Sequence, residues 1–301
     1  MVNEFNLLRT PRIFFGEGKL AHLHEHINQY GKEILVITGN SSFINSRQAS
    51  VLFSQFDAKR IVYYHEKIAH EPSPADIDAL VKKYHNTTID VIVSIGGGSA
   101  IDAGKAVSAM LPLNEPVKEY LEVVGSKKHP GIKIPFIAVP TTAGTGSEAT
   151  NNAVISETGT NGFKRSLRHE NFMPDIALID PELTKTCPPL QTALSGMDAF
   201  TQLIESYLSG KSNRLTSALA LDGIKVIKKS LKIAVAEGDN AEARSGMCYA
   251  ALLSGITLAN AGLGLVHGFA SAIGGLKDIP HGLVCGTLMG TINRFTIEKL
   301  L

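Results

Sequence analysis

The sequence predicts an α/β domain with a mostly parallel sheet, followed by an all-helical domain. Three observations lead to this fold class. Strand and helix patterns alternate up to about residue 180, which is typical of a parallel sheet covered by helices. Two apolar strands each lead into a glycine-rich turn, at 96–99 and 140–148. After the Pro188-Pro189 pair the strand patterns stop and long helical patterns follow.

The first domain, predicted to span residues 1–183, takes its elements from hydrophobic periodicity. Short apolar runs predict strands, and the run at 91–95 is apolar except for Ser94, as expected of a strand buried on both faces. In chain order the strands are expected at 12–15, 33–38, 60–64, 91–95, 134–139 and 176–179, the helices at 17–30, 43–56, 74–86 and 100–110, and a hairpin at 153–169 with its turn at 159–162.

The second domain, predicted to span residues 184–301, has helical patterns at 191–208, 213–236 and 241–258. Its stretch 245–276 carries no Asp, Glu, Lys or Arg and is long enough to cross a bilayer. Glycine, serine, threonine and asparagine interrupt it repeatedly. We therefore interpret it as interior helices and expect no membrane span.

Charge and cysteine content exclude several classes of function. The chain has 29 basic and 28 acidic side chains, a net charge of +1, and no Trp, so neither electrostatic attraction nor stacking favours nucleic-acid binding. Cys187, Cys248 and Cys285 are widely spaced, which indicates thiols and a reducing, cytoplasmic location. The polar start of the chain lacks the apolar core of a signal peptide.

The segment 140–148, Pro-Thr-Thr-Ala-Gly-Thr-Gly-Ser-Glu, has the composition of a phosphate cradle. Gly144 and Gly146 let the backbone approach a ligand closely, and hydroxyls between them donate to anionic oxygens. The hydroxyl-bearing residues are Thr141, Thr142, Thr145 and Ser147. Taken alone, the segment is equally well interpreted as an ordinary turn.

A second turn, Gly96-Gly97-Gly98-Ser99, lies between a strand and a helix, where free N–H groups attract anions. It departs from the GxGxxG fingerprint, because Ile101 stands at the third glycine position. Asp102 and Lys105 share one helix face, and alone they are more simply interpreted as a solvated ion pair. Two such turns in one sheet favour a dinucleotide over a single phosphate.

Candidate metal ligands lie in the helical domain. Asp198 and Gln202 are four residues apart on one helix face among apolar neighbours, which predicts a buried carboxylate that needs a partner. His267 and His281 stand in glycine-flanked, charge-free surroundings. One carboxylate and two imidazoles suit Fe(II) or Zn(II). The alternative is two ordinary core histidines, and Cys285 is interpreted as a buried structural thiol.

Five segments together resemble the iron-containing (group III) alcohol dehydrogenase family. They occur in the family's order and cover nearly the whole chain: GGGSAIDAGK at 96–105, PTTAGTGSE at 140–148, SGMDAFTQLIE at 195–205, GLVHGFA at 264–270 and PHGLVCG at 280–286.

The resemblance implies a Rossmann-like dinucleotide-binding domain and an all-helical metal domain, in a dehydroquinate synthase-like architecture with the active site between them. It implies NAD(P)-linked interconversion of a small alcohol and its aldehyde or ketone, and a homodimer. The residues that match the family's cofactor positions are Gly97, Gly98, Ser99, Asp102, Thr141, Thr142 and Ser147. Those that match its metal ligands, and carry the catalytic role, are Asp198, His267 and His281.

The chain departs from the family pattern at three places. Gln202 stands where a histidine is common, and an amide is a weaker ligand, which leaves Fe²⁺ or Zn²⁺ open. Gln202 is expected either to ligate weakly or to bond a water or substrate. Ser271 replaces another common histidine, so no proton relay is expected there. Members usually continue beyond the equivalent of Leu301, so we expect a shortened or truncated chain.

The turn after the second strand bears on the choice of cofactor. NAD-preferring members tend to place an aspartate near position 39 to accept from the ribose 2′-hydroxyl. Here Gly39 is followed by Asn40, Ser41 and Ser42, with no acid. A 2′-phosphate is then not repelled, and the serines can donate to it. We therefore expect NADP in preference to NAD.

Two alternative functions fit the same residues. The first is a metal-independent NAD(P)H reductase, in which His267 or His281 polarises or protonates the carbonyl. The second is a catalytically idle protein that binds a nucleotide or a partner. In the favoured interpretation the ligand is a small alcohol or aldehyde.

Overall fold

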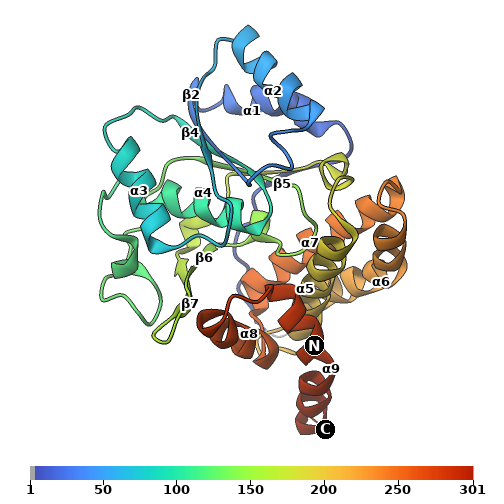
Figure 1. Ribbon diagram of the computed structural model, residues 1–301. Coiled ribbons are helices and arrows are strands. Elements are labelled where there is room, and N and C mark those ends of the chain that lie inside the picture. The colour runs from blue at the N-terminus through green and yellow to red at the C-terminus, as the bar shows by residue number, and fades with distance from the viewer. Residues whose placement is uncertain (1–3, 301) are drawn as a thin grey trace.

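The computed structural model describes residues 4–300 and builds its first half on a six-stranded parallel sheet (Figure 1). The strand order is β1-β8-β5-β4-β2-β3. The strands are β1 (Arg12–Phe15), β2 (Glu33–Thr38), β3 (Val62–Lys67), β4 (Val91–Gly96), β5 (Phe136–Pro140) and β8 (Ile176–Ile179). The strand β3 pairs with one edge of β2 and the next strand, β4, pairs with the other edge, so the direction of strand addition reverses at β2. Such a reversal opens a crevice at the carboxyl ends of the strands.

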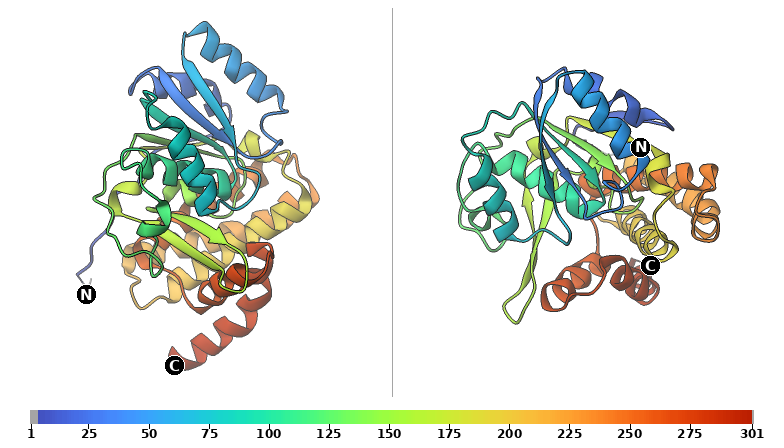
Figure 2. Two further views of the ribbon diagram at one scale, coloured as in Figure 1. Left: turned by 60° about the vertical axis from the view of Figure 1, so that its left-hand side comes forward. Right: turned by 45° about the horizontal axis from the view of Figure 1, so that its top comes forward.

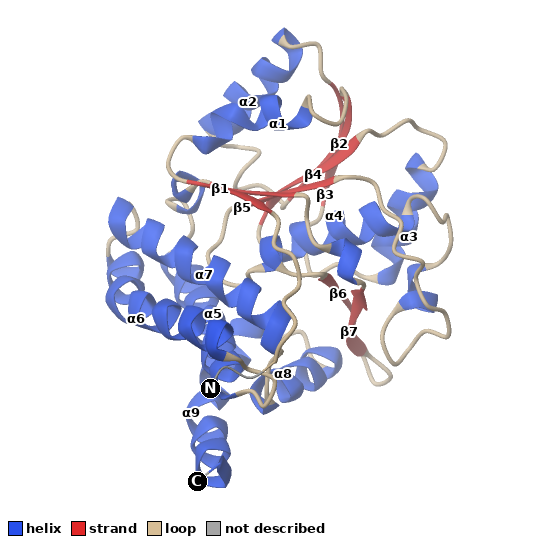
Figure 3. Cartoon of the chain, turned by 180° about the vertical axis from the view of Figure 1, so that it is seen from behind, coloured by secondary structure: helices blue, strands red, loops and turns tan. Residues whose placement is uncertain are grey.

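Helices cover both faces of the sheet because alternate strand residues point to opposite sides. On one face α1 (Leu23–Ile27) and α2 (Arg47–Ala58) pack against residues such as Val36 and Val93. On the other face α3 (Pro74–Tyr84) and α4 (Gly98–Met110) pack against Leu35, Ile92 and Phe136. The central strands β4 and β5 are buried along their whole length, as the apolar run at 91–95 predicts. Figure 3 shows this layering from behind.

An antiparallel hairpin, β6 (Asn152–Glu157) and β7 (Phe163–Arg168), stands apart from the main sheet. It packs against α4 on one side and against α8 (Leu265–Leu276) on the other (Figure 2). The Gly159 N–H donates to the Gly275 carbonyl oxygen at 3.1 Å, so the hairpin turn joins the two halves of the chain.

The second half is helical, which confirms the predicted fold class. It consists of α5 (Pro189–Leu208), α6 (Arg214–Ala236), α7 (Ala241–Ala261), α8 and α9 (His281–Leu300). The helices α5, α6 and α7 pack on one another, and α9 packs against α5 and α8. In residues 4–300 no single helix has the length and apolar character of a membrane span; α7 and α8 reach it only as a pair bent by 98°.

Two predicted helices begin later or are shorter than expected. The predicted helix 17–30 is a 3₁₀ turn, η1 (Lys19–His22), followed by the short α1. The Asp180 carboxylate accepts from the N–H groups of Gly18 and Leu20 at 3.2 and 3.0 Å, which fixes the chain where the helix was expected. The helix predicted from residue 43 begins at Arg47, because the Ser46 hydroxyl caps the Ala49 N–H at 3.1 Å.

Four further 3₁₀ turns connect the elements of the first half. They are η2 (Val117–Tyr120), η3 (Ser147–Ala149), η4 (Glu170–Phe172) and η5 (Pro181–Thr184). The turn η3 is the next element after β5 and carries the end of the predicted phosphate cradle.

Candidate active site

A cavity of about 600 Å³ lies between the carboxyl ends of the strands and the helices of the second half. Residues from both halves line it, as the resemblance implies for an active site. The predicted residues in its wall are Gly39, Gly97, Gly98, Ser99, Asp102, Thr142, Thr145, Ser147, Asp198, Gln202, His267 and His281. Ser42 and Thr141 line a neighbouring cavity of about 110 Å³, and Ser41 lines neither of the two.

The two glycine-rich turns meet in the wall of the larger cavity. A Cβ on Gly98 would lie 2.6 Å from the Thr145 Cγ2, so only glycine permits this approach. Gly97 precedes α4, whose first N–H groups have no intrahelical acceptor and are available to an anion. The pair of turns therefore has the geometry of a cradle for a diphosphate.

The second turn also touches the helical half, backbone against backbone. Gly146 has a φ of 63°, and a Cβ built on it would lie 2.5 Å from the Gly255 nitrogen in α7. A Cβ on Gly255 would lie 2.2 Å from the Gly146 oxygen. Both glycines are thus required for this contact.

Lys105 is a buried structural cation and not part of a solvated ion pair. Its side chain reaches from α4 to the segment after the second turn, where Nζ donates to the carbonyl oxygens of Ser147, Thr150 and Asn152 at 2.7–2.8 Å. Burial lowers the pKa of Lys105 to about 8 and raises the pKa of Asp102 to about 6. Lys105 therefore holds the cradle segment against α4.

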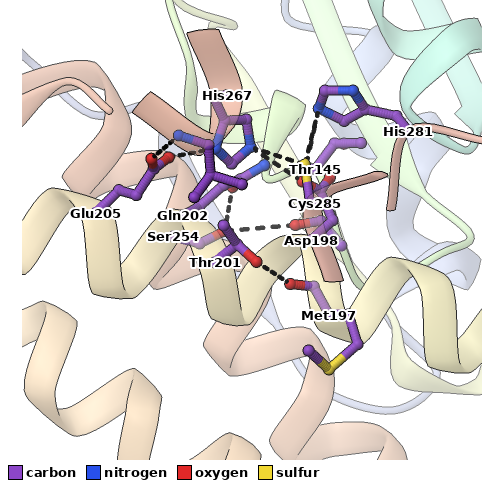
Figure 4. A network of polar contacts seen from close by, with 12 residues as sticks. Thr145, Met197, Asp198, Thr201, Gln202, Glu205, Ser254, His267, His281 and Cys285 are labelled. Atoms are coloured by element: carbon purple, nitrogen blue, oxygen red, sulfur yellow. Dashed lines mark hydrogen bonds and ion pairs between the residues drawn. The ribbon is translucent and has the colours of Figure 1, made fainter. Parts of the chain in front are cut away.

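Four side chains from three helices converge at the opposite wall (Figure 4). Asp198 comes from α5, His267 from α8, and both His281 and Cys285 from α9. The Asp198 Oδ1 lies 3.2 Å from His267 Nε2 and 3.8 Å from His281 Nε2. The Cys285 Sγ lies 3.7 Å from each of these nitrogens. All four candidate ligand atoms lie within 4.8 Å of one another.

Glu205 orients the first of the two histidines. It lies two turns beyond Asp198 on α5, and its Oε2 is 2.5 Å from His267 Nδ1. Its other oxygen accepts from the Val266 N–H at 2.6 Å. With Nδ1 bonded to Glu205, the other ring nitrogen, Nε2, faces Asp198 and Cys285. Metal-binding histidines are commonly held in this way.

Burial and hydrogen bonding shift the pKa values of the cluster in different directions. Burial acts to lower the pKa of His267, but hydrogen bonds to Asp198, Cys285 and Glu205 outweigh it and hold that pKa well above its usual value. Burial lowers the pKa of His281 to about 4. Burial acts to raise the pKa of Asp198, but the His267 hydrogen bond and the nearby imidazoles keep that pKa below its usual range.

Gln202 and Ser271 both line the cavity. Gln202 lies one turn beyond Asp198, and its amide oxygen accepts from the Ser254 hydroxyl at 2.9 Å. Ser271 lies one turn beyond His267 on α8. Both positions departed from the family pattern in the sequence, and both prove to face the same space as the candidate ligands.

Sequence reasoning missed three residues of the site and took Cys285 for a structural thiol. Glu205 was recognisable by its seven-residue spacing from Asp198, which places both on one face of α5. Cys285 was recognisable by its spacing of four from His281. Lys164 and Glu71 form an ion pair at the cavity wall, and the Ser156 hydroxyl donates to Glu71 at 2.8 Å. No local pattern in the sequence links those two residues.

Two family profiles match almost the entire chain. Residues 10–181 match the one described as iron-containing alcohol dehydrogenase. Residues 192–300 match the C-terminal part of the Fe-containing alcohol dehydrogenase family.

Individual relatives agree with these profiles. Alcohol dehydrogenase 4 of Saccharomyces cerevisiae is 36% identical over 93% of this chain and 72% of its own length. The NAD-dependent methanol dehydrogenase of Bacillus methanolicus is 32% identical over 97% of this chain and 76% of its own. The crystal structure of an iron-containing alcohol dehydrogenase from Thermotoga maritima superposes with a TM-score of 0.85 at 31% identity, covering 95% of this chain and 77% of that one.

Proposed function

Since this chain belongs to the iron-containing alcohol dehydrogenase family of oxidoreductases, we propose that it catalyses the metal-dependent, NADP- or NAD-linked interconversion of a small alcohol and its aldehyde or ketone. The observation that carries the proposal is the single cavity shared by the two glycine-rich turns and the Asp198, His267 and His281 cluster. Its two walls supply the two kinds of site that such a reaction needs.

The donor set fits a divalent metal. A buried carboxylate and two imidazole nitrogens suit Zn²⁺ or Fe²⁺, and the Glu205 hydrogen bond leaves His267 Nε2 free to ligate. A metal held by Asp198, His267 and His281 would supply Lewis acidity toward the substrate oxygen.

The opposite wall fits a dinucleotide. The first N–H groups of α4, together with the turn that carries Thr142 and Thr145, surround a space that the glycine at 98 leaves open. We assign the pyrophosphate to this cradle and the nicotinamide, which supplies or accepts the hydride, to the space toward the metal ligands.

The remaining residues position the substrate and exclude water. With its oxygen bonded to Ser254, Gln202 retains amide N–H groups that can donate to the substrate oxygen. The side chains of Asp198, Gln202 and His267 are all buried, so the reacting atoms would lie in a low-dielectric space where these contacts are strong.

We propose NADP as the preferred cofactor. The turn after β2 carries Gly39, Asn40, Ser41 and Ser42, which have no negative charge to repel a 2′-phosphate. Lys67 supports the same choice, because its positive charge would attract a 2′-phosphate. It pairs in register with Thr38 at the carboxyl end of the neighbouring strand β3.

Steady-state turnover of NADPH with aldehydes, before and after chelation and metal return, tests the proposal. Asp198→Ala and His267→Ala should abolish turnover and retain NADPH binding by calorimetry, whereas the exposed His85→Ala should leave both unchanged. Activity in metal-free protein would favour the metal-independent reductase. Binding without turnover would favour the idle nucleotide-binding protein, and unchanged turnover in both variants contradicts the proposal.

Three further assignments complete the proposal. We place the domain boundary near residue 183, which is supported by the end of β8 at Ile179 and the start of α5 at Pro189. We propose a cytoplasmic location from the three free cysteines. A homodimer is proposed from the family resemblance, and light scattering on the purified chain checks it.

A further inference from the structure

We propose that Cys285 is a metal ligand, so that the site consists of Asp198, His267, His281 and the Cys285 thiolate, and that this set selects zinc over iron. The inference rests on the metal site proposed above and changes its ligand set. Gln202, which stands where the resemblance implies a fourth ligand, then binds no metal.

Four distances among the candidate ligand atoms are close to those of a tetrahedral zinc site. Ligand atoms about 2.0–2.3 Å from a central zinc lie roughly 3.3–3.8 Å from one another in tetrahedral geometry. The separations of the Asp198 Oδ1 from the two imidazole nitrogens are 3.2 and 3.8 Å. Those of the Cys285 Sγ from the same nitrogens are both 3.7 Å. Four of the six distances are therefore close to the expected length, and the other two are at most 4.8 Å.

The spacing on α9 favours joint coordination by His281 and Cys285. The two residues are four apart on one helix, so their side chains lie on the same face, one turn from each other. Pairs of ligands at this spacing are a common way for a helix to hold zinc. On α5 the same spacing offers only one strong ligand, because Gln202 follows Asp198.

Gln202 is occupied elsewhere. Its amide oxygen accepts from Ser254 of α7 at 2.9 Å. A neutral amide is also a weaker ligand for these metals than a thiolate. Cys285 thus restores the protein ligand count to four from a different helix, and the substrate oxygen would enter as a fifth ligand from the cavity side.

Burial and charge agree with a ligand role. Cys285 is completely buried and packs in one apolar cluster with Val266, Ala270 and Val284. On binding, the thiol would lose its proton to solvent, and the thiolate with the Asp198 carboxylate would balance the two positive charges of the ion. A thiolate ligand favours zinc, whereas a set of oxygen and nitrogen ligands alone also suits iron. The competing interpretation is that Cys285 merely packs in this apolar cluster.

Cobalt substitution distinguishes the two interpretations independently of activity. The full chain, loaded with Co²⁺ in place of its metal, should show a thiolate-to-cobalt charge-transfer band in the near ultraviolet. The band should disappear in Cys285→Ser and persist in Gln202→Leu. It should also persist in Cys248→Ala, which removes another buried thiol far from the cluster. Zinc affinity, measured by competition with a chelating dye, should fall roughly tenfold or more in Cys285→Ser.

X-ray absorption at the zinc edge of the unmutated protein provides a second measurement that needs no variant to fold. One sulfur neighbour at about 2.3 Å is expected. Cobalt or zinc bound with no charge-transfer band and no sulfur neighbour would overturn the Cys285 assignment and leave the proposed dehydrogenase function intact. Failure to bind either metal would overturn both.

Discussion

Glu205 and His267 are joined by a 2.5 Å contact between carboxylate and imidazole, and the same carboxylate holds the N–H of Val266 at the start of α8. One side chain of α5 thus fixes both the position of α8 and the orientation of the histidine that α8 carries. The chemistry at Nε2 depends on a residue that does not face the cavity.

We expect Glu205→Gln to weaken metal binding by about 10–100-fold, the usual effect of losing such a partner. The amide can satisfy either Val266 or His267 but not both, since only its oxygen accepts. Competition with a chelating dye measures the change. Glu182→Gln, at a partly exposed position in η5, is the matched control. Equal zinc affinity in the Glu205 variant and the parent would contradict the role given to Glu205.

Gly39→Asp should reverse the cofactor preference. A Cβ at Gly39 meets nothing within 4 Å, so the side chain enters open space at the cavity wall. Its charge would repel a 2′-phosphate and accept from a ribose hydroxyl. NADPH affinity should fall tenfold or more, and each tenfold step corresponds to roughly 1.4 kcal/mol of binding free energy. NADH affinity should rise. Gly39→Asn has the same shape without the charge, and a loss of NADPH affinity as large as that of the aspartate would show that charge is not the cause.

Lys105→Met should destabilise the protein by on the order of 3–5 kcal/mol, because it removes the charge partner of the buried Asp102 and the donor to several buried acceptors. The substitution leaves the carbonyl oxygens of Ser147, Thr150 and Asn152 without their donor. Urea unfolding measures the free energy. Lys82→Met on the exposed face of α3 should change it little. NADPH binding should weaken too, because the released segment forms part of the cradle.

Glu148 should make stability depend on pH in an unusual direction. Burial raises its pKa to about 7 from a usual 4.5. Between those values the folded chain keeps a proton that the unfolded chain has lost. This contribution to stability is therefore present below about pH 4.5 and is lost as the pH rises through 7, by roughly 3 kcal/mol in total.

Comparison of Glu148→Gln with the parent isolates this effect. The variant should gain stability relative to the parent between pH 5 and pH 8, as followed by urea unfolding at each pH. Glu157→Gln, at the exposed end of β6, should show no such trend. A difference between Glu148→Gln and the parent that does not change with pH would refute the buried-acid interpretation.

The sequence sufficed for those features that depend on local pattern. The strand 91–95 was predictable because a run that is apolar except for Ser94 has few alternatives, and the face shared by Asp198 and Gln202 follows from helical spacing. The helix at 17–30 was overestimated because Asp180, far along the chain, determines the backbone there.

Features that depend on distant partners could not be predicted. Lys105 is buried because its acceptors come from 42 to 47 residues later in the chain. Cys285 meets His267 and Asp198 only through the packing of α9 on α5 and α8. Neither composition nor spacing indicates contacts between residues that are distant in the sequence. Lys105 was therefore predicted to be solvated and Cys285 to be a structural thiol.

The contact between Gly146 and Gly255 has a consequence for how this enzyme could diversify. It holds the second glycine-rich turn against α7 through main-chain atoms, at two positions where any side chain would collide. Replacements at cavity positions such as Ser271 can therefore alter which molecule fits while the span that a hydride must cross stays the same. Substrate range and transfer distance are thus two separable properties, and the second changes when one of these glycines is replaced and not when a cavity-lining side chain is altered.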